Sequence, residues 1–152
     1  MKKYIVIGNP IEHSLSPKLH NYWIKKYKLK DSLYEKRKVE EKDLINIYEE
    51  IKNDKLAGVN VTVPFKKSIL RFLDILETSA RETESVNTIF KEHGQVIGTN
   101  TDWGGFSDTI EELFPKKNKN EKTLNGKNIF ILGAGGVTSS IIYALRKFGG
   151  TI

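Results

Sequence analysis

A group of polar residues suited to proton transfer follows a short apolar run near the middle of the chain. The segment NVTVPFKK (residues 60–67) alternates valine with Asn60 and Thr62 and reaches Lys66 just after the predicted strand ends. Because successive side chains of a strand point to opposite faces, Asn60 and Thr62 share one face. An amide, a hydroxyl and an ammonium group at one strand end can bind a polar ligand and exchange a proton with it.

A carboxylate that would complete such a site, Asp102, follows a second predicted strand at residues 95–100. If both strands end at the same edge of a sheet, Lys66 and Asp102 meet near Asn87 and Thr101 as an oppositely charged pair for acid–base chemistry. Each charge also has a purely structural explanation. Lys66 could be a solvated lysine of a helical turn, and Asp102 could be an N-terminal helix residue favoured by the helix dipole.

Two serines precede the first predicted helix. Ser14 and Ser16 stand two residues apart in HSLSP, and Ser16 is the expected N-cap of a helix that has Pro17 at its first position. Hydroxyl groups beside the free amides of a helix N-terminus bind a carboxylate well. Taken alone, the segment is explained better by helix capping than by ligand binding.

A glycine-rich turn lies between an apolar run and a helical pattern in the last part of the chain. Gly133, Gly135 and Gly136 of LGAGGVTSS stand where a dinucleotide-binding fingerprint belongs, because glycines permit a tight turn and the close approach of a pyrophosphate. Thr138 stands in place of the third glycine of that fingerprint. The succession of strand, turn and helix favours nucleotide binding over a simple tight turn.

The elements that must position these residues alternate between strands and helices. Strands are expected at residues 3–8, 32–39, 56–63, 86–92, 95–100 and 128–132, and helices within 16–29, 40–54 and 102–114. Two further helices are expected, one with Ile69, Phe72, Leu73 and Leu76, the other with Ile141, Ile142, Leu145 and Phe148. Two apolar stripes are also expected, with Leu19, Tyr22, Trp23 and Tyr27 on the first helix and Phe106, Ile110 and Leu113 inward on the helix from Asp102. This alternation predicts an α/β fold with a mostly parallel sheet flanked by helices and a ligand crevice beyond the carboxyl ends of the strands.

Three parts are expected along the chain. They are an α/β domain at residues 1–114, a lysine-rich linker at 115–126, and the first strand and helix of a Rossmann domain at 127–152. One strand and one helix are too few to cover both faces of a nucleotide-binding sheet, so the second domain is expected to be incomplete. Its exposed strand at 128–132 would invite pairing with another chain, as a homodimer or a strand-paired assembly.

The composition narrows the class of partner. The 152 residues carry a formal net charge of +6, but the basic excess is almost all lysine, with arginine only at Arg37, Arg71, Arg81 and Arg146. This argues against nucleic acid and is compatible with a small anionic metabolite. The chain has no cysteine and its three histidines lack metal-ligand spacing, so neither a disulfide nor a metal site is expected. No secretory signal and no membrane-spanning apolar run is present, so a cytoplasmic protein without membrane contact is expected.

Five short strings, taken in order, resemble one known family. They are GNPIEHSLSP at 8–17, GVNVTVPFK at 58–66, VNTI at 86–89, GTNTD at 98–102 and LGAGG at 132–136. In this order and spacing they strongly resemble shikimate dehydrogenase. The resemblance covers the whole chain, but only about the first half of the family's usual length.

The resemblance implies an oxidoreductase that reduces 3-dehydroshikimate to shikimate with NADPH, on the pathway to chorismate and the aromatic amino acids. Lys66 is the implied catalytic acid and base, and Asp102 orients and charges it. The implied substrate-binding residues are Ser14 and Ser16 for the carboxylate, and Asn60, Thr62, Lys66, Asn87, Thr101 and Asp102 for the ring. The residues implied to hold the pyrophosphate of NADP are Gly133, Ala134, Gly135, Gly136 and Val137.

The chain departs from the family pattern at several points. Glu84 and Ser85 replace the glycine and alanine that commonly precede VNT, and Trp103 follows Asp102 where a glycine is frequent. The basic cofactor-phosphate motif and a substrate-binding glutamine and tyrosine are expected beyond Ile152, so this chain alone is expected to be inactive. Two alternatives stay open: a quinate/shikimate dehydrogenase that uses NAD, and a non-catalytic paralogue that binds shikimate.

Overall fold

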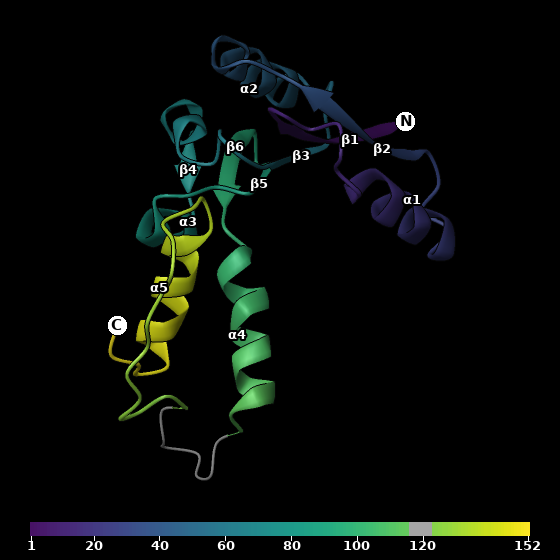
Figure 1. Cartoon of the computed structure of the whole chain (residues 1–152). Helices are drawn as coiled ribbons and strands as arrows, with labels where there is room; N and C mark the ends of the chain where they lie inside the picture. The colour runs from purple at the N-terminus through teal and green to yellow at the C-terminus, as the bar shows by residue number, and fades with distance from the viewer. Residues whose placement is uncertain (116–122) are drawn as a thin grey trace.

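The computed structural model describes residues 1–115 and 123–152. Six strands form one sheet in the order β2-β1-β3-β5-β6-β4 (Figure 1). The strands are β1 (Lys2–Gly8), β2 (Ser32–Lys38), β3 (Gly58–Val61), β4 (Ile75–Leu76), β5 (Thr88–Glu92) and β6 (Gln95–Thr99). The α-helices are α1 (Ser16–Lys26), α2 (Leu44–Lys52), α3 (Thr78–Thr83), α4 (Asp102–Leu113) and α5 (Thr138–Lys147), and the 3-10 helices are η1 (Glu41–Asp43) and η2 (Ser68–Phe72).

The sheet is mostly parallel, which confirms the predicted fold class. Strand β1 runs parallel to both β2 and β3, and β4 runs parallel to β6. Strand β5 is antiparallel to β3 and to β6, so β3 and β6 themselves run in the same direction. The carboxyl ends of β1, β3 and β6 therefore lie at one edge of the sheet, where the predicted polar residues follow them.

Different helices cover the two faces of the sheet. On one face Ile5 and Val59 are opposite each other in the pairing of β1 with β3, and they pack in the main core with α2, which buries Leu44, Ile47 and Ile51. On the other face Val6 belongs to a smaller cluster with Ile24 of α1. Helices α1 and α2 accordingly lie on opposite sides of β1 and β2 (Figure 1). The alternation of side chains along β1 explains why both of its faces are buried.

The segment between β3 and β5 differs from its prediction. Strand β3 ends at Val61 rather than residue 63. The helix expected to carry residues 69–76 is only the short 3-10 helix η2, which ends at Phe72, so its prediction is wrong from Leu73 on. The backbone is extended at Leu73, and β4 then pairs with β6, followed by α3. A Cβ atom built on Gly98 of β6 would lie 2.4 Å from Cδ1 of Leu73, so the absence of a side chain there lets Leu73 pack directly on the sheet. This contact outweighs the local helical spacing.

Helix α1 forms as expected, but its apolar stripe does not enter the core. All four expected residues are exposed, and Ile24 is the α1 residue that packs against the cluster under the sheet. Ser16 is not the N-cap, because the helix begins at Ser16 and Leu15 precedes it as the cap residue. The predicted stripe has helical spacing, but α1 meets the sheet through its other side, where His20 stacks on Tyr34.

The last described part of the chain packs on α4. Ile110 of α4 forms a cluster with Leu145 of α5, and the two helices lie side by side (Figure 1). Leu113, expected to point inward, is exposed instead, because α5 covers only the side of α4 that carries Ile110. Helix α5 was predicted, whereas the strand at 128–132 is reduced to one bridge between Asn128 and Thr151.

Two apolar residues of the segment 128–132, Phe130 and Leu132, do not pack in a sheet. Phe130 and Leu132 are 93% and 99% exposed, since the described residues offer no neighbouring strand to pair with this segment. The predicted linker at 115–126 lies mostly at residues 116–122, outside the described residues. The division into two domains stays a prediction.

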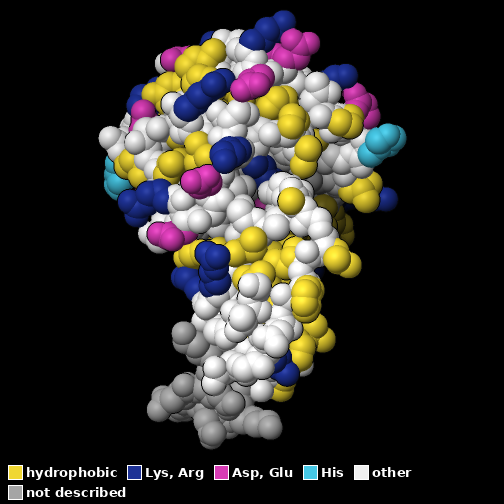
Figure 2. Space-filling model, turned by 60° about the vertical axis from the view of Figure 1, so that its left-hand side comes forward, with side chains coloured by type: hydrophobic (Ala, Val, Ile, Leu, Met, Phe, Trp, Pro, Cys, Tyr) yellow, Lys and Arg dark blue, Asp and Glu magenta, His cyan; other side chains and the backbone are white. Residues whose placement is uncertain are grey.

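The surface agrees with the composition. On the face shown in Figure 2, Lys and Arg side chains are interspersed with Asp and Glu side chains over the broad upper body. Across residues 1–115 and 123–152, no helix combines the length and apolar character needed to cross a membrane. Within the same residues, no group of three acidic or histidine side chains is arranged to hold a metal ion.

Candidate functional site at the carboxyl edge of the sheet

Backbone hydrogen bonds fix Lys66 at the edge of the sheet. Beyond the end of β3, the N–H of Thr62 donates to the carbonyl of Ile7 at 2.9 Å, and the N–H of Asn9 donates to the carbonyl of Val63 at 3.1 Å. The chain then turns through a cis bond between Val63 and Pro64. The carbonyl of Lys66 itself accepts the N–H of Val86 at 2.8 Å. The side chain of Lys66 therefore starts from a well-anchored backbone.

Gly8 makes this close approach possible. A Cβ atom at this position would lie 2.6 Å from Cγ2 of Thr62 and 3.1 Å from the carbonyl oxygen of Val63. The first distance is too short for a real side chain, and the second is tighter than most contacts of a real Cβ atom. The glycine at the end of β1 thus allows the segment that leads to Lys66 to lie against β1.

The structure brings Lys66 and Asp102 together. The Nζ atom of Lys66 lies 2.6 Å from Oδ2 of Asp102, and the two side chains are only 15% and 23% exposed. Asp102 is the first residue of α4, where the helix dipole favours a negative charge. Direct pairing at this distance makes a merely solvated Lys66 the poorer explanation and provides a charged donor with an oriented partner.

Asn87 holds the carboxylate of Asp102 in place. Its Nδ2 donates to Oδ1 of Asp102 at 2.8 Å and to Oγ1 of Thr101 at 2.9 Å. Its Oδ1 accepts the backbone N–H of Thr101 at 3.0 Å. Both oxygens of Asp102 are therefore engaged, one by Lys66 and the other by Asn87, which restricts the rotation of the carboxylate.

Asn60 supports the site from the neighbouring strand. Its Nδ2 donates to the carbonyl of Asn87 at 3.2 Å and to Oγ1 of Thr88 at 3.1 Å, while its Oδ1 accepts the hydroxyl of Tyr34 at 2.6 Å. Both N–H groups of Asn60 are thus used within the protein. Burial raises the pKa of Tyr34 to about 12, so this hydroxyl remains a donor well above neutral pH. Sequence reasoning missed Tyr34, whose only signal is a buried position within the alternation of β2.

Ser14 lies in the loop between β1 and α1, and Ser16 is the first residue of α1. The N–H of Ser14 donates to the carbonyl of Ile11 at 3.0 Å, and Oγ of Ser14 accepts the N–H of Ser16 at 3.4 Å. Ser14, not Ser16, therefore provides the hydroxyl oxygen that accepts the first backbone N–H of α1. Among the described residues, no hydrogen bond joins either serine to Lys66 or Asp102.

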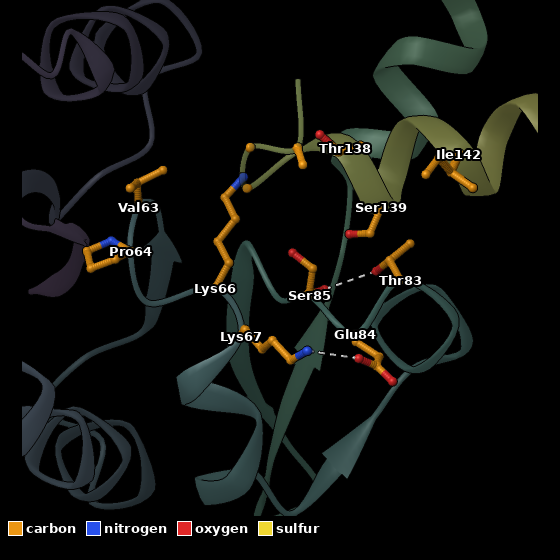
Figure 3. A pocket seen from close by; sticks show the side chains of 13 residues that line it. Val63, Pro64, Lys66, Lys67, Thr83, Glu84, Ser85, Thr138, Ser139 and Ile142 are labelled. Atoms are coloured by element: carbon orange, nitrogen blue, oxygen red, sulfur yellow. Dashed lines mark hydrogen bonds and ion pairs between the residues drawn. The ribbon is translucent and has the colours of Figure 1, made fainter. Parts of the chain in front are cut away.

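A cavity of about 550 Å³ lies between the end of β3 and the start of α5. In Figure 3 the side chain of Lys66 extends across it toward the turn that precedes α5. Its lining comes from three segments, which contribute Val63, Pro64, Lys66 and Lys67, then Thr83, Glu84 and Ser85, then Ala134, Gly135, Gly136, Thr138, Ser139 and Ile142. The predicted acid–base lysine and the predicted cofactor turn thus share one cavity.

The turn at 83–85 is the wall of this cavity that sequence reasoning did not assign. Glu84 has a φ of +46°, a left-handed conformation that glycine adopts more readily than glutamate. Its carboxylate lies 3.1 Å from Nζ of Lys67, and both side chains are exposed. The neighbouring hydroxyl of Ser85 is buried without a hydrogen-bond partner.

The glycine turn fits the phosphates of a dinucleotide. Gly133 has a φ of +107°, which requires a glycine. A Cβ atom at Gly135 would meet nothing within 4 Å, and at Gly136 it would meet only Cγ2 of Val63 at 3.6 Å. Open space at these positions, with no acidic residue in the first turn of α5, leaves the backbone free for an anionic group.

The fold and this edge define the class of the molecule as an α/β protein with a mostly parallel sheet and a charged, polar site beyond the carboxyl ends of its strands. The family described as shikimate dehydrogenase substrate binding domain matches residues 6–89, which is more than half of the chain. The chain belongs to the shikimate dehydrogenase family.

Similar proteins agree with this membership. The shikimate dehydrogenase (NADP(+)) of Pelagibacter ubique is 50% identical over 146 residues, which cover 96% of this chain and 52% of that protein. The crystal structure of the Aquifex aeolicus enzyme matches with a TM-score of 0.85 and 39% identity, over 99% of this chain and 53% of that one. The Thermus thermophilus enzyme in complex with NADP(H) and shikimate matches with a TM-score of 0.81 and 30% identity, over 98% and 53%. The chain spans about half the length of the curated relatives it matches.

Proposed function

We propose that this sequence is the substrate-binding half of an NADP-dependent shikimate dehydrogenase, which reduces 3-dehydroshikimate to shikimate. One observation carries the proposal: the Lys66 ammonium lies 2.6 Å from the Asp102 carboxylate, and Lys66 lines a cavity with the glycine turn. Reduction of a carbonyl requires a proton donor close to the bound nucleotide, whereas simple binding does not. The names of the relatives, and the solved complex with NADP(H) and shikimate, support the same reaction.

Different residues are proposed to bind different groups of the substrate. Ser14 and Ser16 take its carboxylate, with the amides at the start of α1. Thr62 and Thr101 contribute hydroxyl groups beside the ring. Asn87, just before β5, and Asp102, after β6, approach the same ring, and Asn60 holds Asn87 through its backbone carbonyl.

In the reductive direction, NADPH supplies a hydride to the carbonyl carbon when it is bound. Lys66 donates a proton to the carbonyl oxygen as negative charge develops there, and the product is a hydroxyl group. In the oxidative direction Lys66 takes the proton back. Asp102 orients the ammonium group, and Asn87 prevents Asp102 from turning away.

The proposed division of labour follows the chain. Residues 1–114 bind the substrate, residues 115–126 link the two parts, and residues 127–152 begin the NADP site. The residues proposed to hold the cofactor pyrophosphate are Gly133, Ala134, Gly135, Gly136 and Val137. The open backbone at Gly135 and Gly136 supports this assignment.

Turnover by the gene product that contains this sequence tests the proposal. We expect oxidation of shikimate with NADP(+), followed by the absorbance of NADPH, to be faster than oxidation of quinate or reaction with NAD(+). Preference for quinate and NAD(+) would instead identify a quinate/shikimate dehydrogenase. Shikimate binding in calorimetry without turnover on either nucleotide would refute the enzyme and support the binding paralogue.

A further inference from the structure

Asn100 is a buried polar residue within the GTNTD string to which neither the sequence analysis nor the proposed chemistry assigns a role. It lies between β6 and α4, and only 1% of its surface is exposed. Its backbone N–H donates to Oγ of Ser79 at 3.1 Å. A buried carboxamide is costly unless its donors and acceptor are satisfied, so its contacts indicate what it holds together.

One end of the Asn100 side chain fixes the residue that pairs with Lys66. Its Oδ1 accepts the backbone N–H of Asp102 at 2.9 Å. That N–H opens α4 and has no partner within the helix, since the first amides of a helix lack intrahelical acceptors. Asn100 therefore fixes the first residue of α4 and the backbone position from which the Asp102 side chain extends.

The other end of the side chain reaches two segments that line the cavity. Its Nδ2 lies 3.0 Å from Oγ1 of Thr83 and 3.0 Å from the carbonyl oxygen of Ser85, both in the turn that faces Lys66. It also lies 2.9 Å from Oγ of Ser140. Ser140 is fully buried in the first turn of α5, directly after the glycine turn.

Only a carboxamide of this size meets both demands. The Asp102 side of the site needs an acceptor, and the side facing Thr83, Ser85 and Ser140 needs N–H donors. A carboxylate would offer no donor and would place a charge beside the carbonyl of Ser85. An apolar side chain would remove the bonds that Asn100 makes to the N–H of Asp102 and to the hydroxyl of Ser140.

We propose that Asn100 is a positioning residue that couples the placement of Asp102 to that of the first turn of α5. The catalytic part of this inference rests on the proposed function. Through Ser140, Asn100 fixes how far the glycine turn lies from the Lys66–Asp102 pair. The nucleotide and the substrate must both fit into that space. Loosening either end then changes cofactor binding and proton transfer together.

The test compares Asn100→Ala and Ser140→Ala in the gene product that contains this sequence. Ser107→Ala is the matched control, because Ser107 is also a buried serine, lies in the adjacent α4, and has no hydrogen-bond partner for its hydroxyl. Four quantities are measured: kcat, the KM for shikimate, the KM for NADP(+), and the hydrogen exchange rate of the Asp102 backbone amide by NMR. NADP(+) binding is measured separately by calorimetry.

We expect Ser140→Ala to weaken NADP(+) binding by about three- to tenfold, the effect of one lost hydrogen bond, while the KM for shikimate stays within about twofold. Asn100→Ala should lower kcat and speed exchange of the Asp102 amide, each by at least about tenfold. If Asn100→Ala does not fold, the proposal is supported when the Asp102 amide exchanges about threefold or more faster in Ser140→Ala than in the wild type. Ser107→Ala should behave as the wild type.

The inference is overturned if Ser140→Ala binds NADP(+) and exchanges the Asp102 amide like Ser107→Ala. A merely structural role would lower the melting temperature and the active fraction while leaving both KM values unchanged. If the wild type does not oxidise shikimate, the proposed function fails, but the amide exchange and NADP(+) titrations still decide whether Asn100 couples the two segments.

Discussion

Replacing Asp102 by asparagine removes the charge beside Lys66 while keeping the shape of the side chain. The two donors that Asp102 now serves, Nζ of Lys66 at 2.6 Å and Nδ2 of Asn87 at 2.8 Å, both need an oxygen. An asparagine offers only one oxygen, so its NH2 group would face either Nζ of Lys66 or Nδ2 of Asn87. Two hydrogen-bond donors would then oppose each other. The variant therefore loses the orientation of the ammonium group as well as the ion pair.

The size of the effect follows from the burial of the pair. Removing one partner of a fully buried ion pair costs about 3–5 kcal/mol, but both side chains are still partly exposed, at 15% and 23%, so we expect about 2–4 kcal/mol. If the pair acts in the transition state, that lowers kcat/KM for shikimate roughly 30- to 1,000-fold. Asp108→Asn is the matched control, since Asp108 is exposed on the same helix.

The assay is steady-state formation of NADPH from shikimate, with thermal melts to show that both variants fold. Asp108→Asn should retain activity within about twofold of the wild type. The reasoning would be refuted if Asp102→Asn retained activity within about threefold, or if Asp108→Asn lost as much activity as Asp102→Asn.

Two further predictions concern stability. The buried hydroxyl of Tyr34, with its pKa raised from 10.0 to about 12, loses its proton later in the folded than in the unfolded chain, so the free energy of unfolding should fall as pH rises through this range. In urea denaturation, Tyr34→Phe should reduce this pH-dependent loss of unfolding free energy by up to about 3 kcal/mol. The variant also loses the hydrogen bond to Asn60. A pH profile equal to that of the wild type would contradict the prediction. Gly8→Ala should destabilise the protein by about 1–3 kcal/mol because its Cβ meets Thr62, whereas Gly104→Ala, which meets nothing, should not destabilise it, and equal melting temperatures would contradict the argument.

The meeting of Lys66 and Asp102 could be predicted because it depends on strand direction. Strands β3 and β6 run the same way, so residues that follow their carboxyl ends lie at one edge whatever the details of the loops. The alternation of Val59 and Val61 with Asn60 likewise reflects a strand with one face in the main core and the other in the polar site. These features arise from backbone geometry and local burial, both of which leave a mark in a short stretch of sequence.

Other features depend on contacts between distant segments. Residues 69–76 have helical spacing, but Leu73 packs on the sheet because Gly98 leaves room for it, and no local pattern contains that information. Asn100 and Tyr34 act through partners 40 and 26 residues away, Ser140 and Asn60. A single buried polar residue in a sequence does not indicate which partner satisfies it, so both residues became visible only in three dimensions.

The absent strand at 128–132 has a similar cause. Its apolar residues favour a strand, but a strand forms only where a neighbour accepts its backbone hydrogen bonds, and the described residues provide just the bridge from Asn128 to Thr151. Helix α5 does not depend on such a neighbour, because its hydrogen bonds are internal and α4 covers its apolar side.

Comparison of two adjacent lysines tests the central claim most directly. Lys66 is largely buried and paired with Asp102, whereas Lys67 is exposed and paired with Glu84. We expect Lys66→Ala to lower kcat for shikimate oxidation with NADP(+) by about 100- to 10,000-fold, as the loss of a general acid–base group does, and Lys67→Ala to change it by less than about threefold. Equal losses in the two variants, or near wild-type turnover by folded Lys66→Ala, would contradict a catalytic Lys66.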